Sequence, residues 1–555
     1  MTVEVKVPAG APQQGPEAPP AEPSGTHTLR RAVGPWGSYS WGYADVGADI
    51  YVALGLVVAT AEGLANVAFL MAGLVYVTIG LAYTELSAMY PLAGGGPLFV
   101  LRGLGDFWGF VAGWAVLLDF TIDIALFAFS SAGYIDHFFP QLSQQPWITV
   151  EAVGLVVFLY ILNVIGVRES SKLNEVAAAI DICAETVLIF IGFAFAFVPT
   201  FYWHQTVAFL THFDPSRLAL GFSFAIISFV GLESISQASQ ETERPTTIVP
   251  RTSVALILTI LAYALALSNL TLGVLPWQTY DPSVQSSSAV EFCKTVSGHV
   301  LNQADCIAQH TANQNAPIAW LAIHLPIVGS FIAPVIAILG AMLLLISSNA
   351  GVYGSSRIMY SMAEYGLTYR IFTYIQPKFR TPVIALSLFT FLALLELALS
   401  ALTPNALETL ADLYAFGAAT SYTLVFVSLL RLRFTDLETP RVFRVPWNVP
   451  VERNGTVYQV PIVGVLGLIG ISTVLISTIL THPIGRIAGP LWLALGLVLY
   501  YFYRRSQGRP FLRSISRDWS QQQLAVYVES GEVELADEYR QALERRRRKE
   551  DRPEQ

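Results

Sequence analysis

The sequence predicts an all-α polytopic membrane protein with twelve transmembrane helices. Its 555 residues are 54% hydrophobic and only 13% charged, whereas soluble proteins carry about 25% charged residues. The apolar residues gather in twelve stretches long enough to cross a bilayer, which takes about 20 residues. Lys and Arg are almost confined to alternate connections between these stretches. Together the three observations exclude an ordinary globular domain.

The twelve apolar stretches are separated by polar or Gly/Pro-rich connections. They cover residues 43–65, 66–90, 107–136, 148–166, 174–200, 218–240, 252–275, 317–350, 382–403, 408–432, 461–481 and 487–503. The two longest of them extend further than a bilayer requires. An even number of spans places both termini on the same side of the membrane.

The basic residues indicate which side that is. Of the 32 Lys and Arg residues, only Arg217, Lys294 and Arg486 lie outside the terminal segments and the connections on the side of the termini. Cytoplasmic loops of membrane proteins carry an excess of Lys and Arg. We therefore expect a cell-membrane protein with both termini in the cytoplasm.

Composition divides the chain into three parts. Residues 1–40 are rich in Pro, Gly and Ala and lack the apolar region of a signal peptide, so we expect a disordered cytoplasmic tail. Residues 41–503 form the twelve-span membrane domain. Residues 504–555 form a charged cytoplasmic tail, interpreted as a solvated helix or as a contact with anionic lipid through Arg545–Lys549.

The sequence lacks the motifs that several classes of function require. The sequence contains no CxxC motif or Cys/His cluster, so we expect no metal site and no cofactor. HExxH, GxSxG and GxxxxGK[ST] are also absent, which argues against a membrane hydrolase or an ATP-driven pump. Cys293 and Cys306 lie in one polar loop, and whether they form a disulfide is open.

Seven carboxylates stand out within the apolar stretches. Six of them form pairs spaced i,i+4, so that the two members of a pair share one helix face. The pairs are Asp45 with Asp49, Asp119 with Asp123, and Asp181 with Glu185, and Glu233 is the seventh. Glu62 and Glu85 near span ends, and the lone Glu396, are left out of this set.

Paired carboxylates are costly at membrane depth. Two ionised carboxylates at that spacing repel each other, so either one stays protonated or a cation lies between them. Both situations describe a site for a coupling ion or a positively charged substrate. The alternative is that the carboxylates cap helices or bond to neighbouring hydroxyls, although intramembrane ionisable groups are usually functional.

Five segments resemble the amino acid–polyamine–organocation (APC) superfamily of permeases, in order and in spacing. VGADIYVALG in the first span is similar to the IGSGIF signature of that superfamily. The others are AYTELSAMYPLAGGGP (Ala82–Pro97), FVGLESISQASQETERPTTIVPR (Phe229–Arg251), SSNAGVYGSSRIMYSMAEYGL (Ser347–Leu367) and PRVFRVP (Pro440–Pro446). The resemblance covers roughly residues 36 to 450.

The resemblance implies a five-plus-five inverted repeat with broken spans 1 and 6, followed by two further helices. Gly47 and Gly231 lie where those breaks are expected. Unwound backbone is tolerated at membrane depth only beside a cavity or a ligand. The implied function is secondary active transport of amino acids or related amines by alternating access, coupled to H⁺ or Na⁺, and no enzyme activity.

An alternative of the same fold is a K⁺ or other inorganic-cation symporter. Potassium importers in this superfamily also carry an Asp and a Tyr in span 1. If Asp45 matches their Asp, however, Val52 rather than Tyr51 occupies the tyrosine position.

The resemblance and the carboxylate pattern together give the candidate site residues. Those assigned to the substrate are Tyr43, Asp45, Gly47, Ala48, Asp49, Tyr51, Phe229, Gly231 and Asn349, which ends span 8 beside Ser347 and Ser348. Those assigned to the coupling ion are Asp119, Asp123, Asp181, Glu185 and Glu233. No residue is assigned to a metal.

Two departures from the superfamily pattern bear on the ligand. Asp49 stands at the second glycine of the signature, where backbone amides hold the substrate carboxylate in amino acid permeases. Asp181 stands where proton-coupled members often have a lysine. Both changes favour positively charged ligands.

Overall fold

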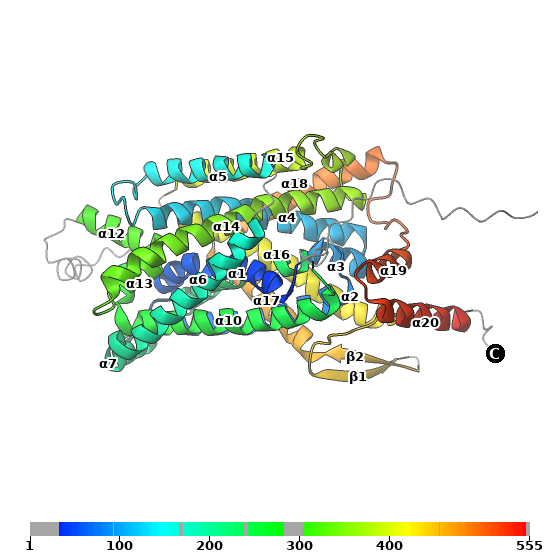
Figure 1. The fold of residues 1–555 in the computed structure, drawn as a ribbon, viewed down its shortest axis with the longest axis horizontal. Helices are drawn as coiled ribbons and strands as arrows, with labels where there is room; N and C mark the ends of the chain where they lie inside the picture. Colours follow the sequence, from blue (N-terminus) through cyan, green and yellow to red (C-terminus); the bar gives the residue numbers. More distant parts are fainter. Residues whose placement is uncertain are drawn as a thin grey trace, which may run out of the picture.

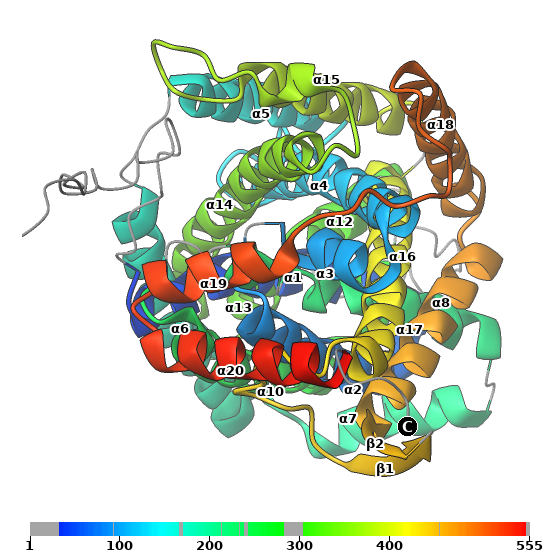
Figure 2. The ribbon, with the colours of Figure 1, turned by 90° about the vertical axis from the view of Figure 1, so that its right-hand side faces the viewer.

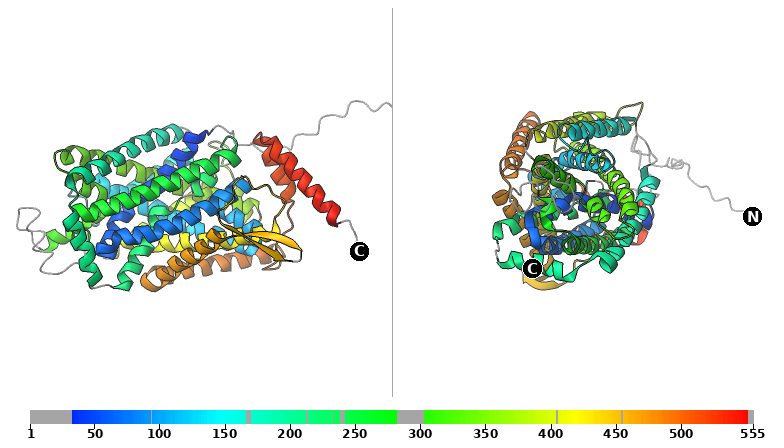
Figure 3. Two further views of the ribbon diagram at one scale, coloured as in Figure 1. Left: turned by 90° about the horizontal axis from the view of Figure 1, so that it is seen from below. Right: turned by 90° about the vertical axis from the view of Figure 1, so that its left-hand side faces the viewer.

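Long apolar helices build the protein. The computed structural model describes residues 33–92, 94–165, 170–211, 214–231, 233–237, 242–281, 303–403, 405–453 and 455–550. In these ranges the long helices lie side by side along one common direction (Figure 1), and the views from below and from the left agree (Figure 3). The only paired strands in the described ranges form a two-stranded hairpin.

The membrane helices follow the predicted stretches closely. They are α1 (Pro35–Ala61), α2 (Ala65–Met89), α4 (Asp106–Ile135), α5 (Trp147–Ile165), α6 (Ser170–Ile191), α8 (Pro215–Ala225), α9 (Glu233–Gln237), α10 (Pro245–Val274), α14 (Gly329–Glu364), α15 (Val383–Ser400), α16 (Ala406–Thr435), α17 (Ile462–Thr481) and α18 (Gly485–Ser506). Eleven helical stretches of the described chain are long and apolar enough to span a membrane, and the first contains both α1 and α2, joined at η1 (Glu62–Leu64). The all-α membrane fold is confirmed, while the inverted repeat stays a prediction.

Shorter elements connect the membrane helices and form the C-terminal end. They are α3 (Gly95–Leu104), η2 (Gly192–Ala196), α7 (Pro199–Thr211), η3 (Ile226–Phe229), η5 (Trp277–Tyr280), α12 (Gln303–Asn315), α13 (Pro317–Ile323), η6 (Arg370–Thr373), β1 (Asn448–Arg453), β2 (Thr456–Pro461), α19 (Trp519–Glu529) and α20 (Val533–Glu550). β1 and β2 pair antiparallel, with Asn448 opposite Pro461. Figure 2 shows α19 and α20 lying across one end of the helix bundle.

Several predicted boundaries differ from the structure. α1 begins at Pro35, so residues 35–40 belong to a helix and not to the predicted tail; residues 1–32 lie outside the described ranges. The stretch 317–350 is divided between α13 and α14, and α14 continues to Glu364. Residues 282–302, which include Cys293, are also outside the described ranges, and so is the side chain of Cys306.

α1 is the central helix of the bundle, and it is continuous. It packs against α6, α8, α10 and α14, and its residues from Gly42 to Val58 are buried. The predicted break at Gly47 is therefore wrong. A single glycine between Val46 and Ala48 is compatible with a membrane helix, which satisfies every backbone amide internally.

Span 6 is interrupted, as expected. The helical backbone stops at Phe229, Val230 is extended, and Gly231 has a φ of +100°. α9 starts again at Glu233. A side chain at Gly231 would be strained, and its Cβ would lie 2.9 Å from Asp45 Oδ2. Glycine is therefore required where this backbone passes closest to α1.

A buried ion cluster joins the end of α2 to the end of α16, although Glu85 was set aside as a span-end residue. Glu85 is fully buried, and its Oε2 accepts hydrogen bonds from Arg433 (2.5 Å) and from the Val445 amide (2.8 Å). Arg441 Nε lies 3.6 Å from the other carboxylate oxygen. Removing one partner from such a cluster leaves a buried charge uncompensated, which lowers the stability of the fold.

We expect Glu85→Gln to lower the free energy of unfolding by about 2 kcal/mol, since a hydrogen bond to a charged group contributes about 1.5–3 kcal/mol. Thermal unfolding in detergent measures the change. Glu438→Gln removes a carboxylate from the exposed pair with Arg546 and is the matched control, with little effect expected. Equal unfolding temperatures for Glu85→Gln and the native chain would contradict the assignment.

A second acidic pair lies at the end of the bundle opposite to α19 and α20. Asp136 directly follows α4 and is 4% exposed, and Glu151 lies near the start of α5. Burial and the neighbouring Glu151 raise the pKa of Asp136 from 3.8 to about 7. The folded protein therefore prefers the protonated form, and this contribution to stability is present below about pH 4 and lost as the pH rises through about 7.

We expect Asp136→Asn to raise the unfolding temperature by a few degrees at pH 8 and to leave it unchanged at pH 4, because asparagine mimics the neutral acid. A pH series of thermal unfolding in detergent checks this. Glu151→Gln relieves the same repulsion and is expected to act in the same direction. A uniform effect of Asp136→Asn at all pH values would show that its protonation is not the cause.

Candidate functional site

The predicted carboxylates converge on the middle of α1. Each of the six paired carboxylates is at most 5% exposed: Asp45, Asp49, Asp119, Asp123, Asp181 and Glu185. They come from α1, α4 and α6. No Lys or Arg occurs in residues 35–90, 107–165 or 173–216, which contain all six. These helices therefore carry a cluster of buried acidic groups.

Two tyrosines of α1 hold the carboxylates of α6. The Tyr51 hydroxyl donates to Asp181 Oδ1 (2.6 Å), and the Tyr43 hydroxyl donates to Asp181 Oδ2 (2.8 Å) and reaches Glu185 Oε2 (3.2 Å). Tyr43, Tyr51, Asp181 and Glu185 are all fully buried. Asp181 is thus bound on both oxygens by neutral donors, which can support an ionised carboxylate without a positive side chain.

Asp181 and Glu185 form an incompletely paired acidic site. Because both carboxylates lie within reach of the Tyr43 hydroxyl, they are within about 6 Å of each other, where like charges disfavour joint ionisation. Glu185 Oε1 is buried and accepts no hydrogen bond from the described residues. Within the same residues, neither carboxylate forms an ion pair with Lys or Arg. The Asp181–Glu185 pair can therefore take up one positive charge.

Asp45 connects α1 to the interrupted span 6 and to α14. Ser347 of α14 donates to Asp45 Oδ1 (3.1 Å), and Ser234 of α9 donates to Asp45 Oδ2. Gly231 lies directly beside the same oxygen. Asp45 is therefore one of the side chains through which the central helix contacts the interruption of span 6.

The carboxylates of α1 and α4 lie near Tyr414 of α16. Tyr414 is buried, and Asp123, Asp49, Asp119 and Asp45 are close enough for their charges to act on its hydroxyl. Small residues allow this close packing of α4, because a Cβ on Gly351 of α14 would lie 3.1 Å from Asp123 Cβ, and one on Gly417 of α16 would lie 3.1 Å from the Asp119 amide. The α1 and α4 pairs therefore belong to one polar region. It lies inside an otherwise apolar core.

The remaining predicted residues take different positions. Ala48 is buried in α1, and Phe229 stacks on Tyr76 of α2 with ring centroids 4.9 Å apart. Asn349 accepts a hydrogen bond from Asn163 of α5 (2.6 Å). Gly47 lies against the Tyr43 ring. Glu233 begins α9, and its side chain lies outside the described residues.

Three site residues were not singled out from the sequence. Ser234 donates to Asp45, Tyr414 lies near the carboxylates of α1 and α4, and the Tyr134 hydroxyl donates to the Tyr51 carbonyl (3.1 Å). Each is a polar residue within an apolar stretch. Hydroxyl residues are common in membrane helices, so a search for polar residues on the carboxylate-bearing faces would have been needed to find them.

Another polar chain links α16, α17 and α8 at the end opposite to α19 and α20. His482 contacts Asp412 through Nδ1, and its Nε2 lies 2.5 Å from Ser223 Oγ. The order Asp–His–Ser is that of a hydrolase triad, but all three side chains are at most 4% exposed. No substrate can reach this serine in the structure, and the contacts between Asp412, His482 and Ser223 instead connect three helices.

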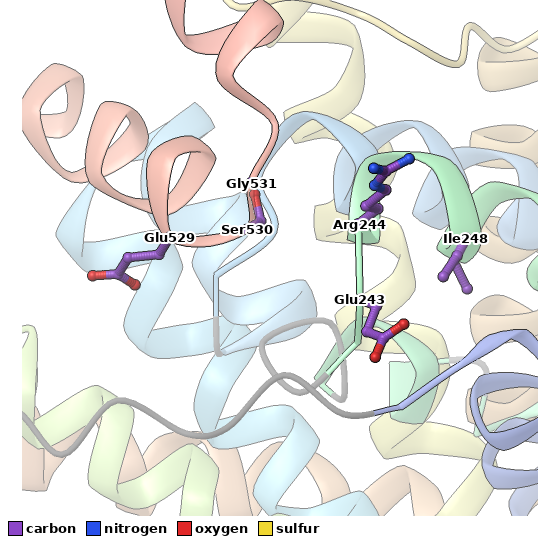
Figure 4. A pocket seen from close by; sticks show the side chains of 6 residues that line it. All are labelled: Glu243, Arg244, Ile248, Glu529, Ser530 and Gly531. Carbon is purple, nitrogen blue, oxygen red and sulfur yellow. The ribbon is translucent and has the colours of Figure 1, made fainter.

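The carboxylates are closed off in this conformation. A cavity of about 540 Å³ lies elsewhere, between the start of α10 and the turn from α19 to α20 (Figure 4). Its lining residues are Glu243, Arg244, Ile248, Glu529, Ser530 and Gly531. The cavity is thus separate from the acidic cluster around α1.

A bundle of membrane-spanning helices with a buried acidic site around one central helix defines a polytopic membrane transport protein. Residues 40–502 match the amino acid permease family, and the chain belongs to that family. It is therefore a transporter-family protein and not an enzyme.

Named relatives transport different amino acids. The branched-chain amino acid permease BcaP of Bacillus subtilis (strain 168) is 24% identical over 509 residues, which cover 88% of this chain and 96% of that protein. Cationic amino acid transporter 4 of Mus musculus is 28% identical over 415 residues, which cover 71% of this chain and 58% of that protein. The gamma-aminobutyric acid permease of Bacillus subtilis (strain 168) is 24% identical over 399 residues, which cover 70% and 76%.

Proposed function

We propose that the chain is a secondary active transporter of amino acids or related amines that works by alternating access in symport with H⁺. It acts in the cell membrane with both termini in the cytoplasm, as the distribution of Lys and Arg indicates. The observation that carries the proposal is the Asp181–Glu185 pair, which is buried, held by tyrosine hydroxyls and able to accept one positive charge.

A proton suits the Asp181–Glu185 pair better than Na⁺. The described partners of Asp181 are hydroxyl groups that donate their hydrogens to it, so their oxygens do not point a cage of acceptors at a metal ion. A proton needs only one carboxylate oxygen, and Glu185 Oε1 offers one. Protonation also removes the repulsion between the two acids.

The substrate ammonium group is assigned to Asp45 and Asp49. These residues lie on one face of α1, and Asp45 contacts both the interruption of span 6 and α14. Because α1 is continuous at Gly47, it exposes no backbone amides there for a substrate carboxylate. A substrate that carries a net positive charge, such as a cationic amino acid, complements this region best.

Uptake into proteoliposomes tests the function. Labelled arginine, leucine, 4-aminobutyrate, putrescine and Rb⁺ are offered separately, with and without a proton gradient that is acidic outside. We expect amine accumulation that an added proton ionophore abolishes and that Na⁺ does not replace. Uptake of Rb⁺ without uptake of any organic compound would refute amine transport and support the cation-symporter alternative.

A further inference from the structure

The C-terminal segment 507–550, here called the C-terminal strap, runs across one end of the helix bundle (Figure 2). It was expected to be a solvated tail or a contact with lipid. In the structure it makes specific buried contacts with four membrane helices, which are described in turn.

The first part of the strap is anchored to α4 and α14. Asp106, at the start of α4, is fully buried and pairs with Arg504 (3.1 Å) and Arg517 (2.6 Å). It also accepts a hydrogen bond from the Ile515 amide (3.0 Å). Arg517 donates to the Tyr365 carbonyl at the end of α14 (2.6 Å). A buried carboxylate with two arginines makes this a firm attachment.

The middle of the strap reaches the end of α2. Gln523 of α19 is fully buried and donates to the Met89 carbonyl (2.7 Å), while its own oxygen accepts from Arg102 of α3 (2.9 Å). The Tyr527 hydroxyl reaches the same Met89 carbonyl (3.3 Å). Gln523 thus satisfies a carbonyl at the end of α2 that has no partner in its own helix.

The last part of the strap reaches the start of α10. Glu532, just before α20, accepts hydrogen bonds from the Thr246 amide (3.2 Å) and from the Thr246 hydroxyl. The cavity of about 540 Å³ lies beside this contact, between Arg244 and Ser530 (Figure 4). This end of the strap is therefore held by few contacts, in contrast to the buried anchor at Asp106.

The strap contacts two pairs of helices. α4 packs most extensively against α14, and α2 packs most extensively against α10. Transporters with repeated helix groups open and close by rocking one group against the other. A segment attached to both pairs at the same end of the bundle must stretch or detach when the pairs separate there.

We propose that the C-terminal strap is an autoinhibitory brake that holds the transporter closed on the side where the strap lies. Its α4–α14 anchor stays in place, while the Gln523 and Glu532 contacts release to let α2 and α10 move. This inference rests on the proposed alternating access.

Cysteine accessibility tests the brake without any need to know the substrate. Ser40 of α1 is 1% exposed and precedes the acidic cluster on the side of the strap. A Ser40→Cys reporter is placed in a chain whose native cysteines are replaced by serine. The rate of maleimide labelling in detergent then reports opening toward the strap.

Gln523→Met together with Glu532→Ala, and separately a chain ending at Asp518, are expected to label at least fivefold faster, since fivefold is already about the effect of one lost hydrogen bond. Asp537→Ala breaks only the exposed Asp537–Arg540 pair on α20 and is the matched control. Unchanged or slower labelling in both strap variants, each eluting as a monodisperse protein, would overturn the brake. Failure of the proposed function would show differently, as absence of uptake by the native chain.

Discussion

Asp181→Asn is expected to abolish proton-driven accumulation of substrate while leaving exchange of substrate across the membrane intact. Asparagine has nearly the same shape but cannot ionise; its amide oxygen accepts from one tyrosine hydroxyl, and its NH2 group donates to the oxygen of the other once that hydroxyl has turned. With one proton per substrate, a gradient of about two pH units supports about 100-fold accumulation, since each unit corresponds to about 1.4 kcal/mol. The variant should reach only equal concentrations inside and outside.

Accumulation and counterflow in proteoliposomes separate these two properties. Glu396→Gln is the matched control, because Glu396 is another intramembrane carboxylate, bonded to Thr121 and outside the Asp181–Glu185 pair. It should accumulate substrate normally. Undiminished accumulation by Asp181→Asn, with the same pH dependence as the native chain, would remove Asp181 from the coupling site.

Asp49→Asn is expected to raise KM for a cationic substrate by about 100-fold or more. Removing one partner of a buried ion pair costs about 3–5 kcal/mol, because the other charge is left uncompensated. Asp49 is 1% exposed in the centre of α1, so bulk water cannot replace it. A neutral amino acid should lose less affinity than arginine, and the ratio of the two KM values is the diagnostic quantity.

Initial uptake rates over a range of substrate concentrations give KM and kcat for each variant. Asp49→Glu keeps the charge and should recover part of the affinity. Ser348→Ala is the control for a general disturbance, since the Ser348 hydroxyl donates to the Ile124 carbonyl of α4, away from the Asp49 carboxylate. Unchanged KM values for both arginine and leucine in Asp49→Asn would show that Asp49 does not contact the substrate amine.

The sequence was most informative at positions where placing the residue in a membrane costs much free energy. Buried carboxylates are expensive in a membrane, so the i,i+4 pairs were visible without any structure, and all six are buried around α1. Gly231 was also predictive, because a positive φ next to Asp45 admits only glycine. The same reasoning failed at Gly47, since glycine is common in continuous membrane helices.

Partnerships between distant residues could not be predicted. Tyr43 and Asp181 are separated by 138 positions, and nothing in either local pattern states that the hydroxyl of one meets the carboxylate of the other. The strap is a similar case. Gln523 and Glu532 belong to a segment whose charge is typical of a solvated helix, and their burial depends on a carbonyl at Met89 and an amide at Thr246.

The interruption of only one central helix has a mechanical consequence. α1 is continuous, whereas the backbone leaves helical geometry at Val230 and Gly231 and can bend there. Helix movements should therefore concentrate at a hinge in span 6, while α1 stays a rigid helix about which the other helices rotate. Amide hydrogen exchange would then be faster at Gly231 than along residues 43–51 of α1.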